Sequence, residues 1–309
     1  MNVWITRLMT VLCISMLAAC GGSDDPHPVN IVETAKADPK FSILVEAVVA
    51  ADLASTLAST GPFTVFAPTN DAFAALLTEL GVTKAQLLAD KALLTAVLTY
   101  HVLPARVPKS GVPPGKAITT VQGGIFKIDA VGADLVITDG RNRTSRIIAT
   151  DVGASNGVIH VIDKVLLPAN KTIVETAVAT PGFGILVEAV TAANLGATLS
   201  GTGPFTVFAP TDAAFAALLA ELGISKAALL ADTTLLTKVL TYHVVAGRVL
   251  KADVPLGTSI TTVEGGTFSV DATLAITDQR ARKANITATD VLASNGVIHV
   301  VDKVILPAP

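Results

Sequence analysis

A ten-residue string that occurs twice constrains the fold more than any other feature of this chain. Residues 60–69 read TGPFTVFAPT, and the same ten letters stand at residues 202–211. Other matches hold the same offset of 142, from Ile31 and Ile173 to Thr119 and Thr261. A period of this length is typical of a whole domain copied in tandem, not of a short solenoid unit.

The offset changes once along the repeat. Residues 155–161, which read SNGVIHV, recur at residues 294–300, so the offset there is 139. Copy two has therefore lost three residues between the positions that match Asp129 and Ile137. Deletions are tolerated best at the ends of loops, and we predict a loop or hairpin end at this point.

The composition indicates two packed domains. The chain has 309 residues, of which 15% are charged and 4% aromatic, with a formal charge of −3 and a pI of about 5.9. Such a chain can bury a core in each copy, and it has no basic footprint for nucleic acid. The sequence has no nucleophile elbow, glycine-rich phosphate loop or metal-ligand spacing, so we predict no enzyme activity, no cofactor and no metal site.

The N-terminal residues resemble the signal of a bacterial lipoprotein. A 12-residue apolar stretch at 8–19 follows Arg7 and leads into Leu17-Ala-Ala-Cys20, which is similar to a lipobox. A stretch of that length fits a signal peptide and is too short to span a bilayer. We expect a signal peptide over 1–19 and a lipidated tether over 20–30, with the lipid on Cys20. An ordinary signal peptide with an incidental cysteine is the alternative.

Within each copy, helical patterns precede strand patterns. Apolar residues recur at helical spacing over 31–37, 41–51 and 71–80, and the period becomes two after residue 102. Asn156-Gly157 stands between two such runs and predicts a tight hairpin turn. We predict an α+β fold with mostly antiparallel strands, with domains over 31–168 and 171–309.

Three motifs, each present in both copies, resemble the signatures of fasciclin (FAS1) domains. They are residues 63–73 and 205–215, the Tyr-His pairs at 100–101 and 242–243, and residues 156–168 and 295–307. The resemblance covers nearly all of residues 31–309. It implies a β-wedge or sandwich core with helices packed around it, and an extracytoplasmic module for adhesion.

Ten residues of these motifs are interpreted as structural. Thr69 and Asn70, like Thr211 and Asp212, precede a helix and are expected to cap its free N–H groups. Asn156 and Gly157 are expected to form the turn, and His160 is expected to be a core histidine with satisfied hydrogen bonds. Their copies are Asn295, Gly296 and His299.

Eight residues are candidates for contact with a partner through the resemblance. Animal relatives link the Tyr-His motif to integrin-dependent adhesion, which carries over to Tyr100, His101, Tyr242 and His243; packing at a helix–sheet junction is the alternative. The relatives also carry an Asp-Ile pair before the last signature, where this chain has Asp151-Val152 and Asp290-Val291. The alternative for both aspartates is a bond to the backbone at a strand end.

Two functions are compatible with the sequence. The first is a non-enzymatic lipoprotein that binds an unknown protein or polysaccharide at the cell envelope, on the outer membrane if the source is Gram-negative. The second is a carrier of a small hydrophobic ligand, since some members of the family bind apolar molecules.

Overall fold

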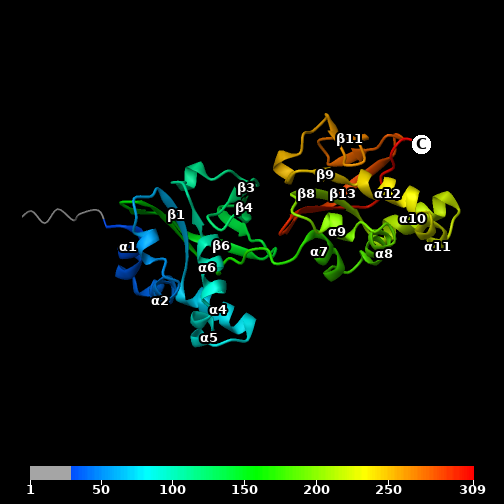
Figure 1. Ribbon diagram of the computed structural model, residues 1–309. Helices are drawn as coiled ribbons and strands as arrows, with labels where there is room; N and C mark the ends of the chain where they lie inside the picture. Colours follow the sequence, from blue (N-terminus) through cyan, green and yellow to red (C-terminus); the bar gives the residue numbers. More distant parts are fainter. Residues whose placement is uncertain (1–28) are drawn as a thin grey trace, which may run out of the picture.

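A computed structural model describes residues 29–309, and in it the two copies form two lobes joined end to end (Figure 1). The predicted signal peptide, Cys20 and most of the tether lie outside the described residues. The elements of domain 1 are α1 (Ile31–Ala37), η1 (Pro39–Phe41), α2 (Ser42–Ala50), α3 (Ala54–Leu57), β1 (Phe63–Pro68), α4 (Asn70–Leu80), α5 (Lys84–Ala89), α6 (Lys91–Tyr100), β2 (Val102–Leu103), η2 (Lys109–Gly111), β3 (Ala117–Thr119), β4 (Ile125–Val131), β5 (Asp134–Thr138), β6 (Thr144–Ala154) and β7 (Gly157–Ile162).

Domain 2 repeats this order. Its elements are α7 (Ile173–Ala179), α8 (Gly184–Ala192), α9 (Gly196–Leu199), β8 (Phe205–Pro210), α10 (Asp212–Leu222), α11 (Lys226–Ala231), α12 (Thr233–Tyr242), β9 (Val244–Ala246), η3 (Lys251–Asp253), β10 (Ser259–Thr261), β11 (Thr267–Val270), β12 (Ala275–Thr277), β13 (Lys283–Ala293) and β14 (Gly296–Val301). The three-residue deletion falls at the β11–β12 hairpin, which is shorter than its counterpart β4–β5.

The helices begin and end at residues with the matching local chemistry. Asn30 and Glu33 form a capping box at the start of α1, and Thr83 and Gln86 form another at α5. Gly81 ends α4 with φ 65°, in the left-handed conformation that glycine adopts at low cost. Each of these ends depends on residues within about one turn of the helix end.

Each domain is built on a seven-stranded sheet with helices packed against it, as the α+β prediction requires. The strand order in domain 1 is β2-β1-β7-β6-β5-β4-β3. Neighbouring strands are antiparallel except β1 and β7, which pair in parallel from Phe63↔Gly157 to Pro68↔Ile162. The sequence does not predict this pairing, because it joins strands separated by the rest of the domain.

The last predicted strand is longer than the observed one. The alternating pattern over 158–167 predicts a strand to Leu167, but β7 ends at Ile162. Beyond the end, Leu166 N–H donates to Nε2 of His101 and Leu167 N–H donates to Oδ2 of Asp139. Side chains replace the neighbouring strand as hydrogen-bond acceptors here, so the segment is extended but is not part of the sheet.

Apolar side chains form two clusters in each domain. In domain 1 the larger cluster lies between the helices and one face of the sheet, with Phe41, Phe73 and Ile159 among its members. The smaller cluster contains Phe66, Tyr100, Phe126 and Ile137. Phe66 and Phe126 meet edge to face with ring centroids 5.1 Å apart, an arrangement that stabilises aromatic pairs.

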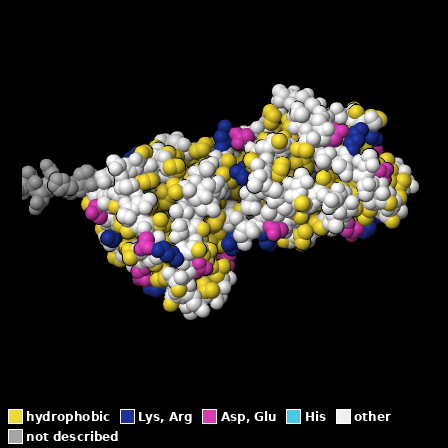
Figure 2. Space-filling model, in the orientation of Figure 1, with side chains coloured by type: hydrophobic (Ala, Val, Ile, Leu, Met, Phe, Trp, Pro, Cys, Tyr) yellow, Lys and Arg dark blue, Asp and Glu magenta, His cyan; other side chains and the backbone are white. Residues whose placement is uncertain are grey.

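The two domains meet through a polar and apolar contact of defined geometry. Lys127 Nζ in β4 lies 2.8 Å from Oδ2 of Asp290 in β13. Asn142 donates from Nδ2 to the Leu292 carbonyl (3.0 Å) and accepts from Leu292 N–H at 2.6 Å. Ile125 packs in an apolar cluster with three residues of domain 2, namely Leu250, Leu292 and Val297. Charged side chains of both signs gather where the lobes meet (Figure 2).

The residues of this contact differ between the copies. Ile125, Lys127 and Asn142 correspond to Thr267, Ser269 and Ala281 in domain 2. On the other side of the contact, Leu250 and Leu292 correspond to Pro108 and Gly153 in domain 1. Domain 2 therefore lacks the residues that domain 1 contributes, and domain 1 keeps only Asp151 and Val158, at the positions of Asp290 and Val297, from the other side.

Candidate functional site

The Asp-Val pair of domain 1 lies on an exposed bulge of β6. The register of β6 against β7 shifts between Ala149 and Val152, and Asp151 has φ 60°. Aspartate is one of the few non-glycine residues that adopt this conformation readily. Bulges commonly redirect a side chain, and the side chain of Asp151 on this irregular strand is exposed.

Neighbouring groups fix the orientation of Asp151. Its Oδ1 accepts a hydrogen bond from Lys109 N–H at 2.9 Å, and its own N–H donates to Nδ1 of His160 at 3.3 Å. His160 is buried, and its Nε2–H donates to the Val107 carbonyl at 2.9 Å. His160 is thus a buried histidine with both nitrogens bonded, as interpreted from the sequence, and it also supports the bulge from below.

Domain 2 has the same bulge with the same bonds. Asp290 has φ 61°, accepts from Lys251 N–H at 2.7 Å and donates to Nδ1 of His299 at 3.3 Å. The difference lies in the surroundings, because Asp290 is 4% exposed and its Oδ2 bonds Lys127 of domain 1. Val291, beside it, is half-buried. The partner of Asp290 in this structure is therefore the neighbouring domain.

The electrostatics of this contact favour a charged pair. Burial acts to lower the pKa of Lys127, but the hydrogen bonds that its ammonium group donates to Asp290 and Asp129 outweigh burial and raise the pKa above its usual value. The ammonium group lies 3.1 Å from Asp129 as well as 2.8 Å from Asp290. The two carboxylates stabilise the positive charge of Lys127, whose side chain is partly buried.

In domain 1 the same bulge is free. Asp151 and Val152 are exposed, and among residues 29–309 the second carboxylate oxygen of Asp151 has no hydrogen-bond or ion-pair partner. Ile148, in the same strand, is 55% exposed and Val152 is 37% exposed. The bulge thus presents an unpaired carboxylate beside exposed apolar side chains.

The Tyr-His pairs are buried in both domains. Tyr100 donates from its hydroxyl to the Ile125 carbonyl and is fully buried, which raises its pKa. Burial also raises the pKa of its copy, Tyr242, to about 12. His101 ends α6, and its Nδ1–H donates to the Val97 carbonyl at 2.7 Å. These rings close the junction of helix and sheet, and neither of them reaches the surface.

Burial holds both histidines of these pairs in the neutral form. It lowers the pKa of His101 and of His243 to about 4 each. In each ring one nitrogen donates to a helix carbonyl and the other accepts a backbone N–H, from Leu166 in domain 1 and Ile305 in domain 2. Such an arrangement uses the full hydrogen-bonding capacity of a neutral imidazole.

The remaining motif residues hold elements together. Thr69 and Thr211 cap their helices by accepting from the N–H groups of Ala72 and Ala214. The expected capping role of Asn70 and Asp212 is wrong, because each is the first residue of its helix. Their side chains instead accept from the N–H groups of Ile43 and Ile185 in an earlier helix.

Asn156 joins the turn to the helical layer. It accepts from Ile31 N–H at 2.9 Å and donates to the carbonyls of Leu57 and Ser59. Asn295 repeats these bonds with Ile173, Leu199 and Gly201. Gly157 and Gly296 lie at the start of their strands, close to the backbone of Phe63 and of Phe205 respectively.

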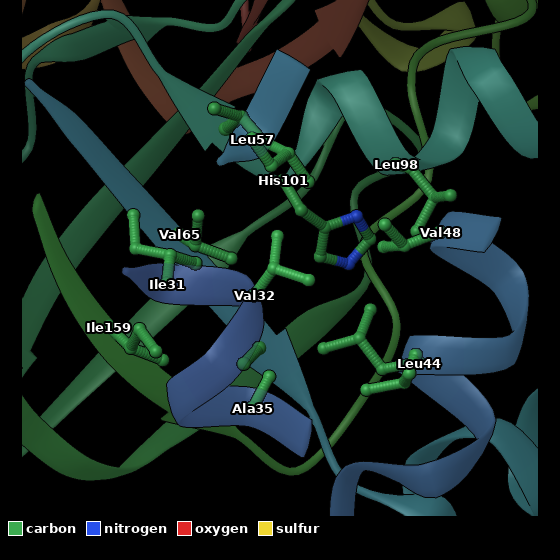
Figure 3. A pocket seen from close by; sticks show the side chains of 13 residues that line it. Ile31, Val32, Ala35, Leu44, Val48, Leu57, Val65, Leu98, His101 and Ile159 are labelled. Carbon is green, nitrogen blue, oxygen red and sulfur yellow. The ribbon is translucent and has the colours of Figure 1, made fainter. Parts of the chain in front are cut away.

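A small apolar cavity lies under the helices of each domain. In domain 1 it has a volume of about 30 Å³ and is lined by side chains of α1 and α2 around the His101 ring, with Val32, Leu44 and Val48 pointing inward (Figure 3). Domain 2 has a matching cavity of about 30 Å³ beside His243. A cavity of about 150 Å³ is needed to hold benzene, so each space has room for little more than a water molecule.

The structure contains neither a metal cluster nor a membrane-spanning helix in the part of the chain it describes. Within residues 29–309, no three His, Cys, Asp or Glu side chains come together as a metal site would require. In the same residues no helix has the length and hydropathy needed to cross a bilayer.

The comparisons with known proteins now decide the family. The model of the fasciclin domain matches twice, over residues 39–168 and 181–307. The chain belongs to the fasciclin domain family. The fold and the two-domain organisation of this fasciclin protein agree with the resemblance seen in its motifs.

Two relatives and one solved structure show how far the similarity extends. Protein sll1483 of Synechocystis sp. is 44% identical over 142 residues, which are 45% of this chain and 73% of that protein. Transforming growth factor-beta-induced protein ig-h3 of Sus scrofa is 31% identical over 248 residues, which are 80% of this chain but 35% of that protein. The structure of a FAS1 domain pair from the insect cell adhesion molecule fasciclin I aligns with 89% of this chain and 95% of its own, at 20% identity and a TM-score of 0.43.

Sequence reasoning missed the domain contact. Lys127 and Asn142 bear no motif, and nothing in a single copy distinguishes them from ordinary surface residues. A signal was available in the comparison of the copies, because Lys127 is matched by Ser269 and Asn142 by Ala281 at otherwise similar positions. Such exchanges indicate that the two copies have different neighbours.

Proposed function

We propose that this fasciclin protein is a non-enzymatic adhesion protein of the cell envelope, which uses the Asp151 bulge of domain 1 to bind a partner protein or polysaccharide that carries a cationic group. One observation carries the proposal: the same bulge in domain 2 binds a lysine of the neighbouring domain through Asp290, at 2.8 Å.

The two bulges are equivalent in backbone conformation and in the groups that hold the aspartate. Asp151 and Asp290 have the same backbone conformation, the same backbone donor to Oδ1 and the same histidine beneath. Each bulge fixes one carboxylate oxygen and leaves the other for a second group. Pre-organised acceptors of this kind bind a cation at less entropic cost than a mobile surface carboxylate does.

Membership in the fasciclin family favours an adhesive role over the carrier alternative. The adhesive role is what the resemblance of the motifs implies, and the exposed bulge offers a surface for it. The core cavities of about 30 Å³ give little support to a carrier of an apolar ligand, because burying such a molecule requires several times that volume.

The test compares the adhesion of two variants, each of which replaces one aspartate by asparagine. Beads coated with the full chain are counted on cells of the source species at low ionic strength. Asp151→Asn should reduce bead attachment several-fold, because asparagine keeps the backbone conformation but loses the charge. Asp52→Asn is the matched control, since Asp52 also has positive φ (56°) and its copy in domain 2 is already an asparagine, Asn194. Equal attachment by wild type and Asp151→Asn would reject the bulge as the binding site.

The anchor and the location form a separate part of the proposal. We infer that Cys20 carries lipid, so Cys20→Ser should release the protein from the membrane fraction and abolish incorporation of labelled palmitate. Antibody labelling of intact cells, compared with permeabilised cells, then tests whether the domains are exposed on the cell surface. Labelling only after permeabilisation would confine the domains to the periplasm and exclude direct contact with other cells.

A further inference from the structure

The contact between the domains leaves a crevice of about 360 Å³ that has an unusual arginine in its wall. The lining comes from the Gln122–Ile125 turn, Gly140 and the Pro168-Ala169 linker on one side, and from Arg248 and residues 292–294 of domain 2 on the other. Crevices of this size between domains are common places for small ligands.

Arg248 has no protein acceptor among residues 29–309. Its Nε is fully buried and unbonded, and no carboxylate lies within ion-pair distance of its guanidinium. The corresponding arginine of domain 1, Arg106, donates from Nη1 to the Gly157 carbonyl at 2.8 Å. A half-buried guanidinium without partners is unfavourable, because desolvation is then not offset by hydrogen bonds.

A second unbonded donor lines the same crevice. Ala169 N–H donates to no acceptor in the described residues, whereas its copy in domain 2, Ala308 N–H, donates to Oε1 of Gln279 at 2.9 Å. Domain 1 has Gly140 at the position of Gln279, so it has no side chain to supply that oxygen. The second domain thus shows that an oxygen acceptor suits this position.

We propose that the crevice binds a small monocarboxylate, whose oxygens accept from the Arg248 guanidinium and from Ala169 N–H. The planar fork of an arginine matches a carboxylate in two parallel hydrogen bonds. Arg248 is the one charged residue among those that line the crevice, which suits a ligand with one negative charge. Ile125 and Leu292, which pack in one apolar cluster, also line the crevice and favour a ligand with a short apolar chain next to the carboxylate.

The experiment uses the full chain and sodium butyrate as the probe, with butyramide as its neutral counterpart. Titration calorimetry should show saturable binding of butyrate and none of butyramide. Amide ¹⁵N NMR spectra should place the largest shifts at Ala169 and Ser294. Inorganic phosphate is titrated separately, and tighter binding of phosphate than of butyrate would overturn the assignment to carboxylates.

Two variants test the role of Arg248. Arg248→Gln should weaken butyrate binding by at least about tenfold, since a charged hydrogen-bonded pair is lost. Arg248→Lys keeps the charge without the fork and should show intermediate affinity. Arg106→Gln is the matched control and should bind as the wild type does. Failure of the wild type to bind butyrate, or unchanged binding by Arg248→Gln, would overturn the proposal, and neither result would affect the role of Asp151.

Discussion

At the scale of single residues, the histidines of each domain are bonded as opposite tautomers. His101 donates from Nδ1 and accepts at Nε2, whereas His160 donates from Nε2 and accepts at Nδ1. Each tautomer matches the one backbone carbonyl within reach of the ring. A second proton on the His101 ring would occupy Nε2, which accepts the buried N–H of Leu166. The fold therefore requires this imidazole to be uncharged.

Acid should therefore destabilise the protein before its carboxylates titrate. The pKa of His101 and of His243 is about 4 in the folded state, against about 6.5 when unfolded. Below pH 6.5 the unfolded state binds more protons, so stability falls as the pH drops to about 4, by on the order of 3 kcal/mol per histidine. Urea unfolding at several pH values measures this slope. The double variant His101→Gln/His243→Gln should have a clearly smaller slope between pH 6.5 and 5, and equal slopes would contradict the prediction.

The two aspartates of the bulges should respond differently to loss of charge. Asp290→Asn leaves Lys127 half-buried with only Asp129 as a partner, so we expect a loss of roughly 2–4 kcal/mol. Asp151→Asn, at the free bulge, should change stability by no more than about 0.5 kcal/mol. Chemical denaturation of both variants checks this, and similar losses would show that the ion pair contributes little.

The sequence predicts the local roles of residues better than their distant partners. The caps Thr69 and Thr211 and the turn at Asn156 follow from three or four neighbouring letters, and they are as expected. That Asp290 would be buried and Asp151 exposed does not follow from their matching motifs. It depends on Lys127, which is 163 residues away in the sequence from Asp290.

At the scale of elements, the close approach of β1 and β7 determines the middle of the sheet. A Cβ on Gly157 would lie 2.1 Å from the Phe63 carbonyl oxygen, and one on Gly296 would lie 2.1 Å from that of Phe205. Only glycine fits where the parallel strands begin to pair. The Asn-Gly motif predicts the turn, but the requirement for glycine comes from the parallel neighbour, which the sequence does not reveal.

The variant Gly157→Ala tests this role of β7. The added methyl group must displace the backbone of Phe63, because its nearest neighbour is that carbonyl oxygen and not a flexible side chain, and we expect a loss of about 3 kcal/mol. Gly153→Ala in the adjacent strand is the control. Its Cβ would meet no atom within 4 Å, so its stability should stay within about 0.5 kcal/mol of the wild type. Thermal unfolding of both variants measures the two effects. An unchanged stability of Gly157→Ala would show that β1 and β7 can move apart.

At the scale of the whole molecule, the contact between the lobes holds the two repeated domains in a fixed orientation. Polar bonds run from β4 and the β5–β6 turn of domain 1 to β13 of domain 2, and Lys116 of domain 1 forms an ion pair of 3.3 Å with Asp253 of domain 2. A linker of a few residues alone would leave the lobes free to rotate. The short linker can be seen in the sequence, but the relative orientation of the domains cannot, because it depends on side chains from both copies.

Replacing two residues of domain 1 by their copies from domain 2 should uncouple the lobes. Lys127→Ser with Asn142→Ala removes the Lys127–Asp290 ion pair and both bonds to Leu292, and it leaves the exposed pair of Lys116 and Asp253. We expect a larger radius of gyration by small-angle X-ray scattering, and two unfolding transitions where the wild type has one. Ser269→Lys, at the matching free position of domain 2, is the control and should change neither. A double variant as compact as the wild type would show that other contacts hold the lobes together.

Because the two domains contribute different residues to this contact, the contact also affects how further domains can be added to such a chain. A third copy added after domain 2 would face Thr267, Ser269 and Ala281, and one added before domain 1 would face Pro108 and Gly153. Domain 2 lacks the residues that domain 1 contributes to the present contact, and domain 1 keeps Asp151 at the position of Asp290 but lacks both leucines. Gene duplication by itself would therefore add a loosely tethered module, and a stacked array would require several coordinated substitutions at each new junction.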